Sequence, residues 1–231
     1  MNFRILAILF MLSTSLSSAQ MFEIGGFVGG SNYIGDVGSS WYIKPNSLAV
    51  GGVFKWNASE RYAYRASVTF STLHASDKDS DTFGRFDRGL SFSNRVFEGA
   101  LGMEFNFWEF DLSPFSRSVT PYIYGGGAVV RYDELYYANL NPGEVAKVTV
   151  GSEKKTTFAI PMALGVKAKI NTRFVLGAEI GLRYTFTDNL DGSYPSDAAK
   201  RFGNVLSDDW YVFSGFTLTY TFGKEPCYSC F

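Results

Sequence analysis

The chain has 231 residues, a formal net charge of -1, 17% aromatic residues, and 24 Gly against 7 Pro. This length fits one barrel or one to two ordinary domains, and the lack of a basic field argues against a nucleic-acid partner. Abundant Gly and aromatic residues indicate strands and turns rather than disorder.

Residues 1–19 have the features of a secretory signal peptide. Arg4 supplies the positive charge, Ile5–Leu12 forms a short apolar core, and Ser17-Ser18-Ala19 forms a small-residue cleavage site. The apolar run is too short to span a bilayer as a helix, and no later stretch is long and apolar enough to do so. A secreted chain of this kind can still span a membrane as a closed barrel.

Eight later stretches alternate apolar and polar side chains with a period of two, which is the pattern of a β-strand with one apolar face. They are 22–33, 46–56, 62–72, 92–108, 121–133, 157–171, 174–186 and 210–222. In 174–186 the even positions carry no charge, whereas the odd positions include Glu179 and Arg183. At about 3.3 Å per residue, such a strand crosses a bilayer at a tilt. In 121–133 we expect Tyr122, Tyr124 and Tyr132 to face the apolar side.

The connections alternate between long and mostly short. Long polar loops are predicted near 34–45, 75–90, 134–155 and 189–207, and short turns at 57–61 and 171–173, with 109–119 a longer exception on the short side. Outer-membrane barrels have short periplasmic turns and long outer loops, and an even strand number places both termini in the periplasm. The sequence therefore predicts an all-β, eight-stranded antiparallel transmembrane β-barrel of the outer membrane over residues 20–222, followed by a periplasmic tail at 223–231.

Alternation alone does not say which face points outward. The apolar face carries many Phe, Tyr, Leu and Trp side chains, and an eight-stranded lumen cannot hold that volume at native packing density. The other face, rich in Gly, Thr, Ser and Ala, fits inside. A soluble, lipocalin-like barrel with its apolar face inward therefore fails on volume, and we expect the apolar face to contact lipid.

Charged residues of both signs fall on the face that points into the barrel. They are Arg65, Glu98, Glu104, Arg131, Lys167, Lys169, Glu179 and Arg183. One interpretation is an ion path or a proton relay. The other is a plug of paired charges, because an unpaired buried charge costs several kcal/mol. Similar numbers of both signs in a narrow barrel favour the plug.

The sequence gives little indication of catalysis, and we expect no cofactor or metal. The one His, His74, lies among Ser and Asp without a metal-binding motif. The run from Asp77 to Asp81 resembles the start of a calcium loop, but Thr82 replaces the required Gly and Arg88 the final acid. Only a weak surface contact with calcium is left open there.

Four stretches resemble the PorG-like family, the small outer-membrane barrel of the type IX secretion system. They are 29–36 (GGSNYIGD), 120–127 (TPYIYGGG), 160–167 (IPMALGVK) and 183–188 (RYTFTD), and together they touch most of the mature chain in the expected order. The sequence departs from the family pattern at 189–192 (NLDG), where a further aromatic residue and a second acid are expected.

This resemblance implies a non-catalytic barrel that anchors a large periplasmic ring, built from a lipoprotein and its partner (PorK/PorN type, or GldK/GldN in gliding bacteria). It implies a scaffold role in protein export and, in some members, in gliding motility. The alternative is a stand-alone small barrel of the OmpA or OmpW sort, for envelope stability or the passage of small solutes.

Cys227 and Cys230, the only cysteines, lie in the predicted periplasmic tail, where disulfides persist. A bridge between them closes a loop too short to stabilise the fold much. A zinc site lacks two further ligands, and a redox-active pair lacks its usual thioredoxin-like fold. Two interpretations stay open: the local bridge, and a disulfide that joins the tail to the ring lipoprotein suggested by the resemblance.

Overall fold

The computed structural model describes residues 21–39, 41–113, 118–137, 148–204 and 207–223. The predicted signal peptide at 1–19 lies outside the described residues, as do Cys227 and Cys230.

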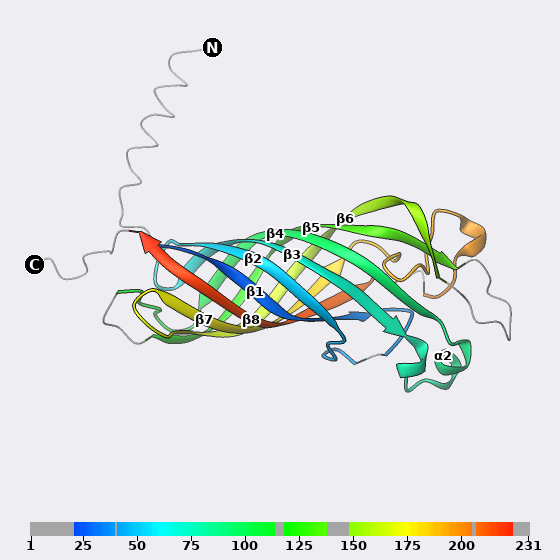
Figure 1. Cartoon of the computed structure of the whole chain (residues 1–231), viewed down its shortest axis with the longest axis horizontal. Helices are drawn as coiled ribbons and strands as arrows, with labels where there is room; N and C mark the ends of the chain where they lie inside the picture. The colour runs from blue at the N-terminus through cyan, green and yellow to red at the C-terminus, as the bar shows by residue number, and fades with distance from the viewer. Residues whose placement is uncertain (1–20, 40, 114–117, 138–147, 205–206, 224–231) are drawn as a thin grey trace, which may run out of the picture.

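The chain forms a closed antiparallel barrel in which each strand pairs with the next and β8 pairs with β1 (Figure 1). The strands are β1 (Met21–Ile34), β2 (Ser47–Asn57), β3 (Tyr62–Ser76), β4 (Ser91–Asn106), β5 (Val119–Tyr137), β6 (Val148–Lys169), β7 (Phe174–Thr185) and β8 (Trp210–Gly223). Closure satisfies the backbone groups that a sheet edge would leave unpaired. The predicted fold class is confirmed.

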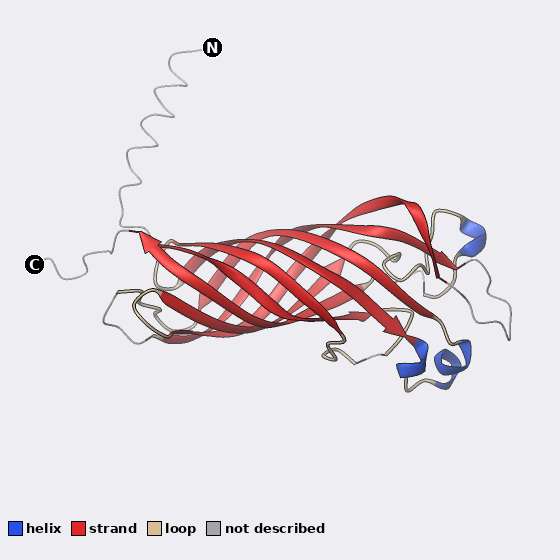
Figure 2. Cartoon of the chain, viewed as in Figure 1, coloured by secondary structure: helices blue, strands red, loops and turns tan. Residues whose placement is uncertain are grey.

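Among the described residues, helix is confined to short pieces in the long connections, as Figure 2 shows. They are η1 (Asp77–Asp79), α2 (Phe83–Arg88) and η2 (Ala198–Lys200). No helix in the described part of the chain is long and apolar enough to cross a membrane. Gly89 ends α2 in the left-handed conformation, with φ of 64°, which glycine adopts without steric cost.

Several strands run further than the alternation predicted. β3 continues to Ser76, and β5 and β6 form a hairpin that reaches Tyr137 and begins again at Val148. The predicted loop at 134–155 is therefore partly strand. Polar residues in this segment interrupt the alternation of apolar and polar side chains, so the sequence does not show the strand. Backbone pairing between β5 and β6 nevertheless continues past a register shift between Asp133 and Leu135.

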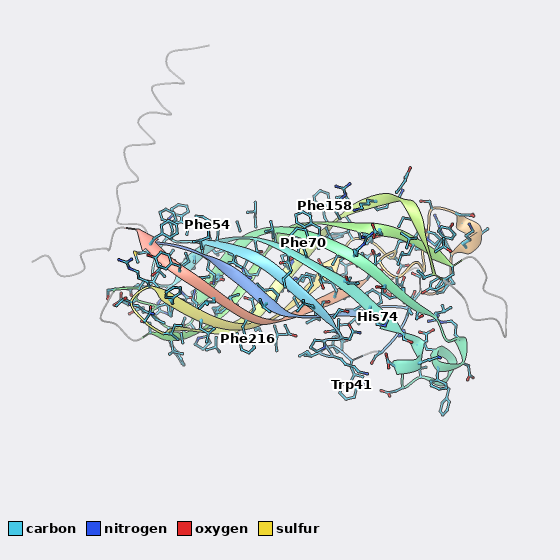
Figure 3. All side chains as sticks on the ribbon, in the orientation of Figure 1. Trp41, Phe54, Phe70, His74, Phe158 and Phe216 are labelled. Carbon is cyan, nitrogen blue, oxygen red and sulfur yellow. The ribbon has the colours of Figure 1, made fainter. Side chains whose placement is uncertain are left out.

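The outward face of the barrel is apolar, as expected from the volume argument. Leu101 is 69% exposed and Phe158 67%, and Figure 3 shows Phe54, Phe70 and Phe216 pointing away from the barrel. Aromatic pairs lie near both ends of this face: Trp56 with Tyr64 at one end and Tyr184 with Trp210 at the other. This is the aromatic-girdled profile of a lipid-facing barrel surface.

The predicted orientation of β5 is wrong. Tyr122, Tyr124 and Tyr132 are buried inside the barrel, and Arg131 is exposed on its outer face. The reason is cross-strand pairing: Tyr124 lies opposite Glu104, and residues directly opposite in an antiparallel pair point to the same face. An inward Glu104 therefore requires an inward Tyr124, and Arg131 does not belong to the lumen charges.

Both ends of the described chain lie at one end of the barrel, because Met21 pairs with Gly223. The short connections after β2 and β6 lie at this end, which we call the terminal end. The longer connections after β1, β3, β5 and β7 lie at the opposite end, together with α2 (Figure 1). We call that the loop end.

Candidate functional site

The interior of the terminal half of the barrel is organised around Glu104. Its carboxylate lies 2.8 Å from Lys55 Nζ, 2.9 Å from Lys167 Nζ and 3.3 Å from Arg65 Nη1. Three different strands besides β4 deliver these cations, so the contact exists only in the closed barrel. Glu104 is fully buried, and three charge-assisted contacts satisfy its oxygens.

Arg65 joins this centre to a second carboxylate. It donates to Glu179 through both terminal nitrogens, at 2.6 and 2.8 Å, in the bidentate arrangement that suits a guanidinium. The Tyr122 hydroxyl donates to Glu179 at 2.6 Å. Tyr122 can therefore be buried in the lumen, because its ring fills space there and its hydroxyl has a hydrogen-bond acceptor.

Two more carboxylates complete the polar interior. Glu98 accepts from Arg183 Nε at 3.3 Å and from the Tyr211 hydroxyl. Glu23 accepts from Asn57 Nδ2 at 3.0 Å and from the Thr219 hydroxyl. The buried acids Glu23, Glu98, Glu104 and Glu179 thus match the buried cations Lys55, Arg65, Lys167 and Arg183 one for one in charge. The lumen is electrically balanced.

The structure places six of the eight predicted lumen charges in this balanced network. Lys169 lies at the terminal end, where its Nζ donates to the carbonyls of Leu112 and Ser113, and Arg131 is outside. The prediction missed Lys55 and Glu23, and it placed the inward tyrosines Tyr122, Tyr124 and Tyr132 on the outer face. Strand parity is enough to predict that Glu23 and Lys55 face the lumen. Glu23 lies between two outward-facing residues of β1, and Lys55 lies between two outward-facing residues of β2.

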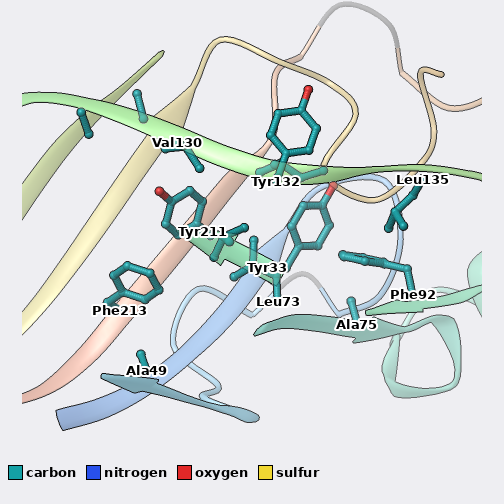
Figure 4. Packing of buried hydrophobic residues seen from close by; sticks show 14 of the residues in the cluster. Tyr33, Ala49, Leu73, Ala75, Phe92, Val130, Tyr132, Leu135, Tyr211 and Phe213 are labelled. Atoms are coloured by element: carbon teal, nitrogen blue, oxygen red, sulfur yellow. The ribbon is translucent and has the colours of Figure 1, made fainter. Parts of the chain in front are cut away.

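Beyond the charges, towards the loop end, the lumen is filled by apolar side chains. Figure 4 shows Tyr33, Leu73, Phe92, Tyr211 and Phe213 packed against one another across the barrel. The Arg183 guanidinium lies 4.5 Å from the ring centroid of Phe213, which joins the polar half to the apolar half. These side chains therefore fill this part of the lumen at close-packed density.

Connections cover the two ends. At the terminal end Phe110 and Leu112 pack on Val175, and Lys167 Nζ lies 5.0 Å from the ring centroid of Phe110. At the loop end Leu190 is fully buried in the apolar cluster, and its N–H donates to Asp209. Described parts of the connections therefore pack against lumen residues at both ends of the barrel.

Asp77, the first residue of the predicted calcium-like run, has a different role. It is buried and accepts from the N–H groups of Gly38 and Leu90 at 2.8 and 3.0 Å, and it pairs with Arg88 at 2.8 Å. One carboxylate thus ties the connection after β1 to the connection after β3. These contacts use both of its oxygens, so the residue is explained by loop packing.

In arrangement this fold is similar to outer-membrane barrels of known structure. OprG from Pseudomonas aeruginosa matches with a TM-score of 0.47 and 10% identity, covering 89% of this chain and 97% of that chain. Ail, the attachment invasion locus protein of Yersinia pestis, matches in its complex with the heparin analogue sucrose octasulfate (TM-score 0.46, 10% identity, 88% and 99% covered). A major outer membrane protein from Thermus thermophilus matches with a TM-score of 0.47 and 14% identity over 88% and 100%.

No curated protein matches the chain. A family model does match it, over residues 3–231, which is nearly its whole length. By that match the chain belongs to the family described as Domain of unknown function (DUF6089).

Proposed function

We propose that this chain is a non-catalytic scaffold of the outer membrane that anchors the periplasmic ring of the type IX secretion machinery, with a role in gliding motility where the organism glides. Both termini lie in the periplasm in this proposal. The partners are lipid around the barrel and, at the terminal end, a ring lipoprotein with its associated protein (PorK/PorN or GldK/GldN type). The tail with Cys227 and Cys230 is the segment that would form a disulfide to that lipoprotein.

The observation that carries the proposal is that paired charges and packed side chains fill the lumen in the described part of the chain. A solute path needs a continuous wet channel, whereas here the charges pair with one another and apolar side chains fill the remaining half. A barrel with such an interior is expected to be rigid, which suits a structural anchor better than a channel. The stand-alone barrel for small-solute passage lacks this support, although a stand-alone barrel for envelope stability fits the same interior.

Orientation is tested by labelling single cysteines in a Cys227→Ser, Cys230→Ser background. Gly84→Cys, in α2, has no atom within 4 Å of the added Cβ, and Ala58→Cys is exposed in a short turn at the terminal end. We expect a membrane-impermeant maleimide to label position 84 on intact cells and position 58 only after the outer membrane is opened. Labelling of position 58 but not 84 on intact cells contradicts the proposed orientation.

The anchoring role is tested by deletion in a bacterium with type IX secretion. We expect loss of export of type IX substrates, restored by the full chain, while uptake of small solutes stays unchanged. Normal export together with altered solute uptake or detergent sensitivity contradicts anchoring and favours a stand-alone barrel.

The partner surface is tested in the same strain. Trp108, which is 61% exposed, and Glu109 lie on the connection at the terminal end. Trp108→Ser combined with Glu109→Lys is expected to reduce co-purification of the ring lipoprotein in mild detergent. Phe83→Ser, which replaces another exposed aromatic residue at the loop end, is the matched control and leaves co-purification unchanged.

A further inference from the structure

Three cations lie on the outer wall of the barrel near the loop end. They are Arg95 on β4, Arg131 on β5 and Lys154 on β6, and all three are exposed. The three strands are consecutive neighbours in the sheet and lie side by side (Figure 1). We call these residues the wall cations. They point away from the lumen, so the paired charges inside the barrel do not account for them.

The strand register brings the wall cations together. Arg131 lies opposite Phe97 on β4 and opposite Thr156 on β6. Arg95 and Lys154 each lie two residues closer to the loop end than these partners. Each is therefore a diagonal neighbour of Arg131 on the same face, with about 7–8 Å between Cα atoms. Side chains as long as Arg and Lys can reach one anion from these three positions.

The wall cations carry more positive charge than the acids around them balance. Arg95 Nε pairs with Asp133 at 3.1 Å, and its side chain is still 76% exposed. Neither Arg131 nor Lys154 forms a salt bridge with a described acid. The surface thus presents two cations that lack a described counter-charge and a third that is only partly covered.

The wall cations lie just beyond the apolar part of the wall. From Val119 to Val129 no outward residue of β5 has a polar side chain, and the same holds on β6 from Ile170 back to Phe158. At about 3.3 Å per residue and a tilt of about 40°, this stretch of β5 rises about 25 Å, the height of the apolar band of an outer-membrane barrel. Arg131 is the next outward residue, so the wall cations lie at the level of lipid headgroups.

We propose that Arg95, Arg131 and Lys154 bind the anionic phosphate headgroup of a membrane lipid at the loop end of the barrel. A guanidinium donates to two phosphate oxygens at once, and the ammonium of Lys adds a point charge. Val129 and Phe158, which pair directly below, offer an apolar surface to the acyl chains. The inference needs only the lipid-facing wall, so it does not depend on a role in type IX secretion.

A lipid fits this position better than a soluble anion does. The wall cations point sideways from the barrel, and their patch is continuous with the apolar surface below it. A phospholipid in contact with that surface holds its phosphate at the height of Arg131, and basic residues at this height attract anionic lipid. A free phosphate ion gains the same charge contacts but none of the apolar contact.

The test uses the full chain refolded in a non-ionic detergent at physiological ionic strength, with bound lipid counted by native mass spectrometry. The probes are dioleoyl phosphatidic acid, dioleoyl phosphatidylcholine and inorganic phosphate. We expect the chain to retain one phosphatidic acid in preference to phosphatidylcholine, and inorganic phosphate at the same concentration not to displace it. Equal retention of the two lipids overturns the proposal. Displacement by inorganic phosphate also overturns it, because the site would then recognise a soluble anion.

Variants distinguish the wall cations from the general charge of the loop end. Arg131→Gln combined with Lys154→Gln is expected to weaken phosphatidic acid binding by about tenfold or more. Asp133→Asn is expected to tighten it by about twofold to fivefold, because the substitution releases Arg95 from its carboxylate. Lys200→Gln, on the connection after β7 where Lys200 pairs with Asp197 at 3.3 Å, is the matched control and leaves binding unchanged.

Faster migration of the folded band on an unheated gel shows that each variant has formed the barrel. The proposal is overturned if the folded double variant retains phosphatidic acid as the unaltered chain does. It is also overturned if Lys200→Gln weakens binding as much as the double variant, since general charge would then explain the effect. Tighter binding by Asp133→Asn supports the site independently, because loss of folding cannot produce it.

Discussion

Glu104→Gln is expected to lower the free energy of unfolding of the barrel by about 3–5 kcal/mol. The substitution keeps the size of the side chain but removes the negative charge that Lys55, Arg65 and Lys167 share. Arg65 keeps Glu179, whereas Lys55 and Lys167 lose their paired carboxylate in the lumen. The measurement is urea unfolding in lipid vesicles, followed by Trp fluorescence and by the folded band on a gel.

The control for this prediction is Glu109→Gln, which removes an exposed carboxylate paired with Arg61 at 3.2 Å. An exposed pair contributes about 0–1 kcal/mol, so little change is expected. Adding Lys167→Met to Glu104→Gln should recover part of the loss, because one unpaired cation is removed. Equal effects of the Glu104 and Glu109 substitutions would contradict the view that the network holds the lumen together.

Ile180→Arg is expected to destabilise the barrel by about 2–4 kcal/mol. Ile180 lies in the middle of β7 and is 45% exposed on the outer face, so the substitution places a charge near the bilayer midplane. Folding efficiency and the free energy of unfolding in vesicles are the readouts. The cause is transfer of a guanidinium into hydrocarbon, so the effect depends on depth.

Ile170→Arg is the matched control for depth. Ile170 follows β6 at the terminal end and is 57% exposed, so the same substitution there costs about 0–1 kcal/mol. If both substitutions cost the same in vesicles, the outer face of β7 is not in contact with the hydrocarbon core. That result would also count against the assignment of the apolar face to lipid.

The period-two pattern was enough to predict the number and order of the strands. In 174–186 every charge falls on odd positions, and because a strand alternates its faces, parity alone assigns Glu179 and Arg183 to the lumen. The volume of the apolar face then decides which side meets lipid. Parity likewise assigns Lys55 and Glu23 to the lumen, because each lies between two outward-facing residues of its strand.

Three features were decided by tertiary structure. The face of β5 followed from the pairing of Tyr124 with Glu104, because a strand rich in aromatic residues and glycine has no clear polar face. The sharing of Glu104 among cations from β2, β3 and β6 depends on barrel closure. The hydrogen bond from the Asn204 N–H to Asp36, at 2.8 Å, depends on connections far apart in sequence meeting at one end. Sequence periodicity reports only which side of its own strand a residue occupies, whereas partners across a barrel are set by the register of all eight strands.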